Sequence, residues 1–173
     1  MKPSRNAGAG DRGAADAGPS APARSGAEGA GAEGARALVR RHLVFGWGAL
    51  LVFLSLGIVL EALHGLKVGL YVNPSGSARR LMWTLAHAHG TLLGLIHLAF
   101  AATIFIGGAG DWRRAGWVSL CLRSATYLLP GGFFLGGLVT YGGDPGLGVF
   151  LVPVGALALV GGVGWLWLGL RKG

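Results

Sequence analysis

Long apolar runs separated by short polar linkers dominate the chain from residue 42 onward. The runs cover residues 42–63, 80–107, 115–139 and 145–170. A helix needs about 20 residues to cross the hydrocarbon core of a bilayer, and every run is long enough. The linkers carry turn-forming residues, as in YVNPSGSARR, GAGDWRR and YGGDPG. The pattern therefore predicts an all-α integral membrane protein, with residues 39–173 forming a Gly-rich bundle of four transmembrane helices.

The segment before these runs has a different composition. Residues 1–38 consist mainly of Ala, Gly, Pro, Ser and Arg and contain no aromatic side chain. Such a segment cannot bury enough apolar surface to offset the entropy lost on folding. Its four acidic residues are atypical of a transit peptide. Residues 1–38 are therefore predicted to form a disordered tail.

Composition agrees with a membrane protein and argues against other classes. The 173 residues are 52% hydrophobic and 13% charged, whereas a soluble domain has about 25% charged residues. The net charge is +8, but the basic residues lie in the tail and beside the apolar runs, so we expect no nucleic-acid partner. Cys121 is the single cysteine, which excludes an internal disulfide and a Cys-based zinc site.

The basic residues that flank the runs predict the orientation. Those on the side of both termini are Arg36, Arg40, Arg41, Arg113, Arg114, Arg171 and Lys172. Those on the other side are Lys67, Arg79 and Arg80. Because Lys and Arg accumulate in short cytoplasmic flanks, both termini are predicted to be cytoplasmic in a plasma (bacterial inner) membrane. The 61–80 and 140–146 loops are then external.

Glycine spacing predicts how the helices pack. Lipid is as apolar as leucine, so transmembrane helices associate through small residues and hydrogen bonds. A heptad stripe runs along the fourth span, and G-x-x-x-G pairs occur in the second and third spans. The glycines concerned are Gly148, Gly155, Gly162 and Gly169 in the fourth span, Gly90 and Gly94 in the second, and Gly132 and Gly136 in the third.

Ionisable residues at the external end form one candidate site. Glu61 and His64 are three residues apart and project on one side of the first helix. His87 lies about 10 Å into the second helix at 1.5 Å per residue, so a bundle could bring the three together. A carboxylate with two imidazoles could bind a transition metal or relay protons. The alternative is a hydrogen-bond network that only fixes the bundle.

A second candidate polar site lies deeper. Helical spacing places His97 on the same face as His87, whereas His89 lies on a different face. His89 could meet lipid headgroups, a second subunit or another helix. Arg123 lies about 12 Å into the third span. It could snorkel to the cytoplasmic surface, or face inward and bond Tyr127 and His97.

Searches for catalytic motifs find nothing. The spans hold no nucleophile elbow, Walker A loop or pair of carboxylates, so no catalytic residue is assigned. The sequence favours a non-enzymatic protein acting through its bundle or its partners, which are the lipid bilayer and a homo-oligomer or membrane-protein partner. No cofactor is indicated directly. The alternatives left open are a redox element that binds haem or a transition metal through Glu61, His64 and His87, and an oligomeric proton-coupled carrier of small solutes.

Several short motifs occur together in residues 45–172. They are LEALHGLK at the end of the first span, AHAHGTLLGL in the second, FFLGGLVTY closing the third and VPVGALALVGGVGWLWLGL in the fourth. This set resembles the small four-span inner-membrane family of unknown function that includes YgdD. The matching positions are His64, one of His87 and His89, Gly136, Gly137, Pro153 and Gly155. The resemblance implies a four-helix bundle in the plasma membrane and assigns no activity.

Overall fold

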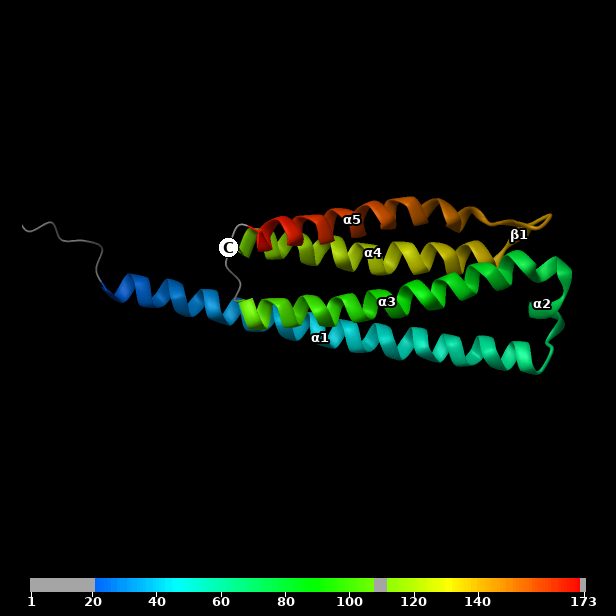
Figure 1. The fold of residues 1–173 in the computed structure, drawn as a ribbon, viewed down its shortest axis with the longest axis horizontal. Coiled ribbons are helices and arrows are strands. Elements are labelled where there is room, and N and C mark those ends of the chain that lie inside the picture. The colour runs from blue at the N-terminus through cyan, green and yellow to red at the C-terminus, as the bar shows by residue number, and fades with distance from the viewer. Residues whose placement is uncertain (1–20, 108–111, 172–173) are drawn as a thin grey trace, which may run out of the picture.

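The computed structural model describes residues 21–107 and 112–171. Within them, four helical segments are long and apolar enough to cross a membrane, Gly29–Gly65, Ser77–Gly107, Ala115–Leu138 and Leu147–Leu170. They lie in α1 (Ala21–Gly65), α3 (Ser77–Gly107), α4 (Trp112–Leu138), and η2 (Leu147–Phe150) with α5 (Leu151–Leu170). The prediction of an all-α integral membrane protein is thus confirmed (Figure 1).

Helix α1 begins well before the predicted apolar run. Residues 21–38, which the composition assigned to the tail, lie in this helix. Residues 1–20 of the predicted tail lie outside the described residues. The segment is rich in alanine, the best helix former. The composition argument asks only whether a segment can bury apolar surface, and it takes no account of this local helix propensity. At its inner end Leu38 is buried against Phe100 and Ile104 of α3, so α1 joins the bundle before its hydrophobic run starts.

The long helices lie in a row that follows the chain. Helix α1 packs on α3, α3 on α4, and α4 on α5, whereas α1 touches α4 only slightly. Figure 1 shows α1 beside α3 and α5 beside α4, all roughly parallel to one long axis. The two outer helices consequently turn large apolar faces outward, where Ile58 of α1 and Leu157 of α5 are more than two-thirds exposed. A bilayer is the solvent that suits such faces.

Short elements close the end of the bundle opposite to the start of α1. Between α1 and α3 lie α2 (Gly69–Val72) and η1 (Pro74–Gly76), and between α4 and α5 lies the hairpin of β1 (Thr140–Tyr141) and β2 (Asp144–Pro145). Arg79 ties these connections together. Its guanidinium donates to the carbonyl oxygens of Gly137 at 3.0 Å and Leu70 at 3.2 Å. Both loops are therefore held against the start of α3.

Most of the predicted packing glycines lie at helix contacts. A Cβ on Gly155 would be 2.7 Å from the Leu129 nitrogen, one on Gly162 3.0 Å from Cys121, and one on Gly148 2.6 Å from the Gly136 nitrogen. A Cβ on Gly132 would likewise be 2.9 Å from the Gly148 carbonyl oxygen. The stripe on α5 therefore packs on α4.

Gly169 departs from the predicted stripe. A Cβ there would have nothing within 4 Å. Among the described residues, the seam between α4 and α5 includes Gly148, Gly155 and Gly162 but not this last glycine.

Glycines also set the contact between α1 and α3. A Cβ on Gly46 would be 2.9 Å from the Gly94 carbonyl oxygen, and one on Gly94 would be 3.1 Å from the Gly46 carbonyl oxygen. Further along, Gly90 faces the ring of Phe53. The two backbones therefore approach closely in an antiparallel register that opposes Gly46 to Gly94.

Candidate functional site

Two histidines meet in the interior where α1, α3 and α4 come together. His42 and His97 have no exposed surface, and their Nδ1 atoms are 2.6 Å apart. His42 Nε2 is 2.8 Å from the Ser119 hydroxyl, and His97 Nε2 is 3.0 Å from the Thr126 hydroxyl. Both hydroxyl residues are buried as well. Four polar side chains from three helices thus form one buried network, which we call the histidine network.

One arrangement of protons satisfies every bond of this network. The Thr126 hydroxyl donates to the Leu122 carbonyl oxygen at 3.0 Å and, in this arrangement, accepts from His97 Nε2. A neutral His97 then has a bare Nδ1, which accepts from His42 Nδ1. Neutral His42 in turn accepts at Nε2 from the Ser119 hydroxyl. With both imidazoles neutral, each group in the chain Ser119, His42, His97, Thr126 donates to the next, and Thr126 donates to the Leu122 carbonyl oxygen.

Close helix contact brings the two histidines together. His42 lies one turn before Gly46 on α1, and His97 lies about one turn after Gly94 on α3. Because the glycine pair brings the antiparallel backbones into contact, both imidazoles enter the same layer. Phe45 borders this layer, and its ring packs edge-on against His97 with 4.6 Å between the ring centroids. The network is buried and adjoins the apolar core, where Phe100 meets His42 edge-on.

The predicted second site is arranged differently from the expectation. His97 bonds His42 and Thr126 rather than Arg123 or Tyr127. Tyr127 is 63% exposed, and its ring packs edge-on against Phe45 at 5.5 Å between centroids. Arg123 is half-buried. The hydrogen bonds of His97 thus differ from those predicted, because α4 turns Thr126 toward α3 and leaves Tyr127 largely exposed.

His42 was missed by sequence reasoning. It opens the first apolar run and follows two arginines, so it reads as part of the polar flank. A signal was present, however. Leu38, His42, Gly46 and Leu50 recur every four residues, and all four are buried in the structure. A small residue one turn from a histidine on such a face marks a helix contact.

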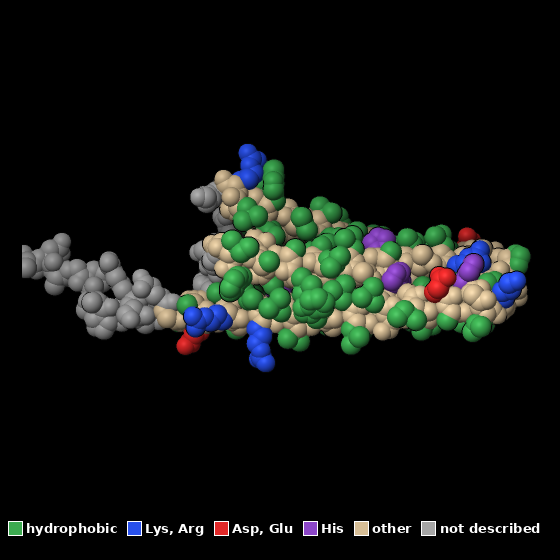
Figure 2. Space-filling model, turned by 60° about the horizontal axis from the view of Figure 1, so that its bottom comes forward, with side chains coloured by type: hydrophobic (Ala, Val, Ile, Leu, Met, Phe, Trp, Pro, Cys, Tyr) green, Lys and Arg blue, Asp and Glu red, His purple; other side chains and the backbone are tan. Residues whose placement is uncertain are grey.

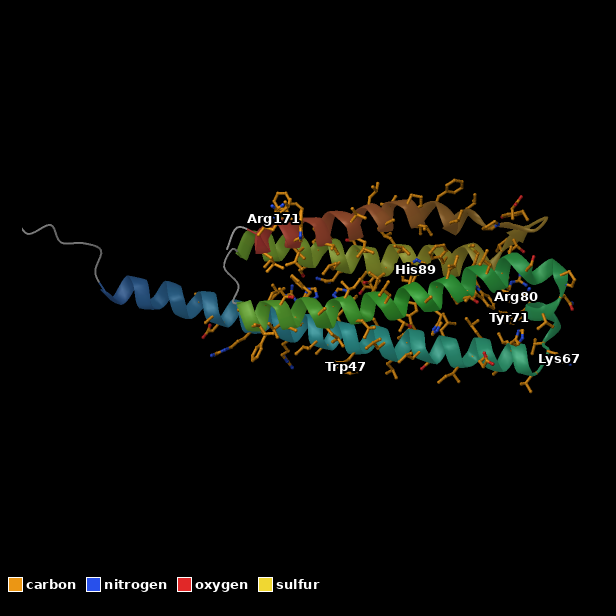
Figure 3. The ribbon with its side chains drawn as sticks, in the orientation of Figure 1. Trp47, Lys67, Tyr71, Arg80, His89 and Arg171 are labelled. Atoms are coloured by element: carbon orange, nitrogen blue, oxygen red, sulfur yellow. The ribbon has the colours of Figure 1, made fainter. Side chains whose placement is uncertain are left out.

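His89 contacts another helix of the bundle, one of the three possibilities raised by the sequence. Its Nδ1 donates to the Leu85 carbonyl oxygen of its own helix at 2.9 Å, and its ring lies 5.0 Å from that of Phe133 on α4. Figure 3 shows it in the middle of α3 on the side of α4. It does not join the histidine network.

A cleft opens between α1 and α3 near their connection. Its volume is about 870 Å³. The lining includes Glu61, His64, Arg80 and His87, together with Leu54, Ile58, Leu60 and Leu81. Figure 2 shows charged and histidine side chains gathered at this end of the molecule, and Figure 3 places Tyr71 and Arg80 there. The structure therefore places Glu61, His64 and His87 along one cleft, which we call the α1/α3 cleft.

His87 forms the inner part of this lining. Its Nδ1 donates to the Phe53 carbonyl oxygen at 2.7 Å, and its ring occupies the space left by the missing side chain of Gly57. Glu61 lies one turn further toward the surface, about 6 Å along the helix from Gly57. Glu61 and His87 therefore occupy different levels of the cleft.

The three predicted residues do not gather around one point. Within residues 21–107 and 112–171, no group of three His, Cys, Asp or Glu side chains is close enough to hold a metal ion. The antiparallel register explains this arrangement, because it pairs His87 with Gly57 and leaves Glu61 and His64 nearer the surface.

The two polar groups of side chains differ in how fully they are bonded. Both imidazoles of the histidine network use both ring nitrogens within the protein. In the cleft, Glu61 and His64 are exposed, and the hydrogen bonds that Arg80 makes to described residues use only Nη1. A buried network with all its bonds made fixes a structure. Polar side chains with bonding capacity to spare can bind something else.

Searches against known proteins add no relative. The chain matches no protein-family model, no curated protein and no solved structure.

Proposed function

We propose that this is a non-enzymatic membrane protein that binds an amphiphilic ligand in the α1/α3 cleft. One observation carries the proposal, a cleft of about 870 Å³ that combines charged and aliphatic lining residues. Ligand sites commonly measure about 300–1,000 Å³ and are mostly apolar with a few convergent polar groups. The cleft has this size and this mixture.

The lining changes in character with depth. Glu61 and His64 lie close to the end of α1, and Leu54 lies about 10 Å deeper along the same helix at 1.5 Å per residue. Arg80 lies in the first turn of α3 at the same surface. A ligand with a polar head and an apolar chain matches this order, because its head would stay near water while its chain lay along the aliphatic wall.

We also propose an orientation. Seven basic flanking residues on the side of both termini, against three on the other, support cytoplasmic termini in a plasma (bacterial inner) membrane. The cleft then opens toward the external leaflet. The resemblance to the four-span inner-membrane family would agree with this placement.

Filling the cleft tests the proposal. Thr84 of α3 is an exposed cleft-lining residue, and a Thr84→Trp substitution adds bulk where the ligand would lie. We expect lipid retention through purification to fall about tenfold, equivalent to about 1.4 kcal/mol of binding free energy. Native mass spectrometry of the detergent-solubilised protein measures the retained lipid.

The matched control is Leu92→Trp on the same helix. Leu92 is 52% exposed and lies outside the cleft lining, so its variant should retain lipid as the unsubstituted protein does. Equal retention in the Thr84→Trp variant and the unsubstituted protein would contradict the proposal.

A further inference from the structure

We infer that the α1/α3 cleft selects a headgroup carrying a phosphate and a primary ammonium together. This inference rests on the proposed function and names the chemistry of its ligand. An acidic and a basic side chain, Glu61 and Arg80, line the same cleft. A single ligand that satisfies both must itself carry both signs of charge.

Arg80 is arranged to receive the phosphate. Its Nη1 donates to the carbonyl oxygens of Tyr71 at 3.3 Å and Val72 at 3.5 Å, which fixes the guanidinium against the loop that closes the cleft. Among the described residues its Nε and Nη2 make no hydrogen bond, so these donors can face a ligand. A guanidinium offers paired N–H donors that match phosphate oxygens, and His64 in the same lining supplies a further ring nitrogen.

Glu61 discriminates among phosphate-bearing heads. An exposed carboxylate in the cleft would repel an anionic head that has no compensating cation. A head with an ammonium beside its phosphate removes this repulsion, because the ammonium donates hydrogen bonds to the carboxylate. The pair of residues therefore disfavours a purely anionic head.

The lining also favours a primary over a quaternary ammonium. A quaternary ammonium has no N–H to donate and is recognised through open aromatic faces. Tyr71 is the aromatic residue of the cleft, but it is only 4% exposed. Its ring is stacked on Trp83 at 6.5 Å and met edge-on by His64 at 6.4 Å between centroids. Carboxylate hydrogen bonding to N–H groups is the contact that the cleft offers.

The test compares headgroups on the full-length delipidated protein in detergent. The probes are short-chain phosphatidylethanolamine, phosphatidylglycerol and phosphatidylcholine, together with free phosphoethanolamine, and binding is read by native mass spectrometry. We expect phosphatidylethanolamine to bind about tenfold more tightly than the other two lipids. Glu61→Gln should abolish its preference over phosphatidylglycerol while binding continues, and Arg80→Gln should weaken all three lipids.

Controls separate this inference from the proposed function. Lys67→Gln changes a charge at the same end but outside the cleft lining and should leave the preference intact. Lipid binding without a headgroup preference, or a preference that survives Glu61→Gln, would overturn the inference and leave the proposed function standing. No lipid binding at all would overturn both. If free phosphoethanolamine bound as tightly as the lipid, the headgroup chemistry would be supported, but the proposal that the ligand is an amphiphile would be overturned.

Discussion

Replacing His97 by alanine is expected to lower the free energy of unfolding by about 3 kcal/mol. The substitution removes a buried side chain and leaves the Nδ1–H of His42 without an acceptor in a site that has no exposed surface. Interhelical hydrogen bonds in membranes average only about 0.6 kcal/mol. Most of the lost stability therefore comes from the cavity and from the buried His42 N–H that is left without an acceptor. Equilibrium unfolding in mixed micelles, followed by circular dichroism, measures the change.

His89→Ala is the matched control, because it removes the same side chain from the same helix. His89 donates its hydrogen bond to the Leu85 carbonyl oxygen of its own helix, so its loss leaves no group on another helix without a hydrogen-bond partner. We expect an effect below about 1 kcal/mol. Equal losses in the two variants would refute a special role for the histidine network. Adding His42→Ala to His97→Ala should cost less than the sum of the single losses, because both single changes break the same bond between His42 and His97.

Gly155→Leu is expected to destabilise the bundle by about 3 kcal/mol, at the upper end of overpacking effects. Even a Cβ at this position would be 2.7 Å from the Leu129 nitrogen and 3.1 Å from the Leu128 carbonyl carbon. Backbone atoms cannot rotate away as a flexible side chain can, so α5 must separate from α4. The same unfolding measurement detects the change.

Gly161→Leu supplies the comparison on α5. A Cβ at Gly161 would meet nothing within 4 Å, so a larger side chain there extends into lipid. Its effect should stay within about 0.5 kcal/mol. If Gly155→Leu proved equally harmless, the close approach of α4 and α5 would not be a source of stability.

The spans were predictable because apolar length alone decides whether a helix crosses a bilayer. The start of α1 was not, since Ala-rich sequence forms helix for local reasons that composition does not register. His87 was placed against α1 by the register of Gly57, and no spacing rule gives the register of two helices. Likewise, Thr126 rather than Arg123 meets His97, because the rotation of α4 depends on packing along its whole length.

The row of helices has a consequence for assembly of the chain. Helices α1 and α3 form one antiparallel hairpin, and α4 and α5 form another, with the closest glycine contacts inside each hairpin. Each hairpin can insert and close using only neighbouring sequence, which is the fast route for a folding chain. The bond from His42 to Ser119 joins residues 77 positions apart and links α1 of the first hairpin to α4 of the second. It can form only after both hairpins have docked, so it reports completed assembly.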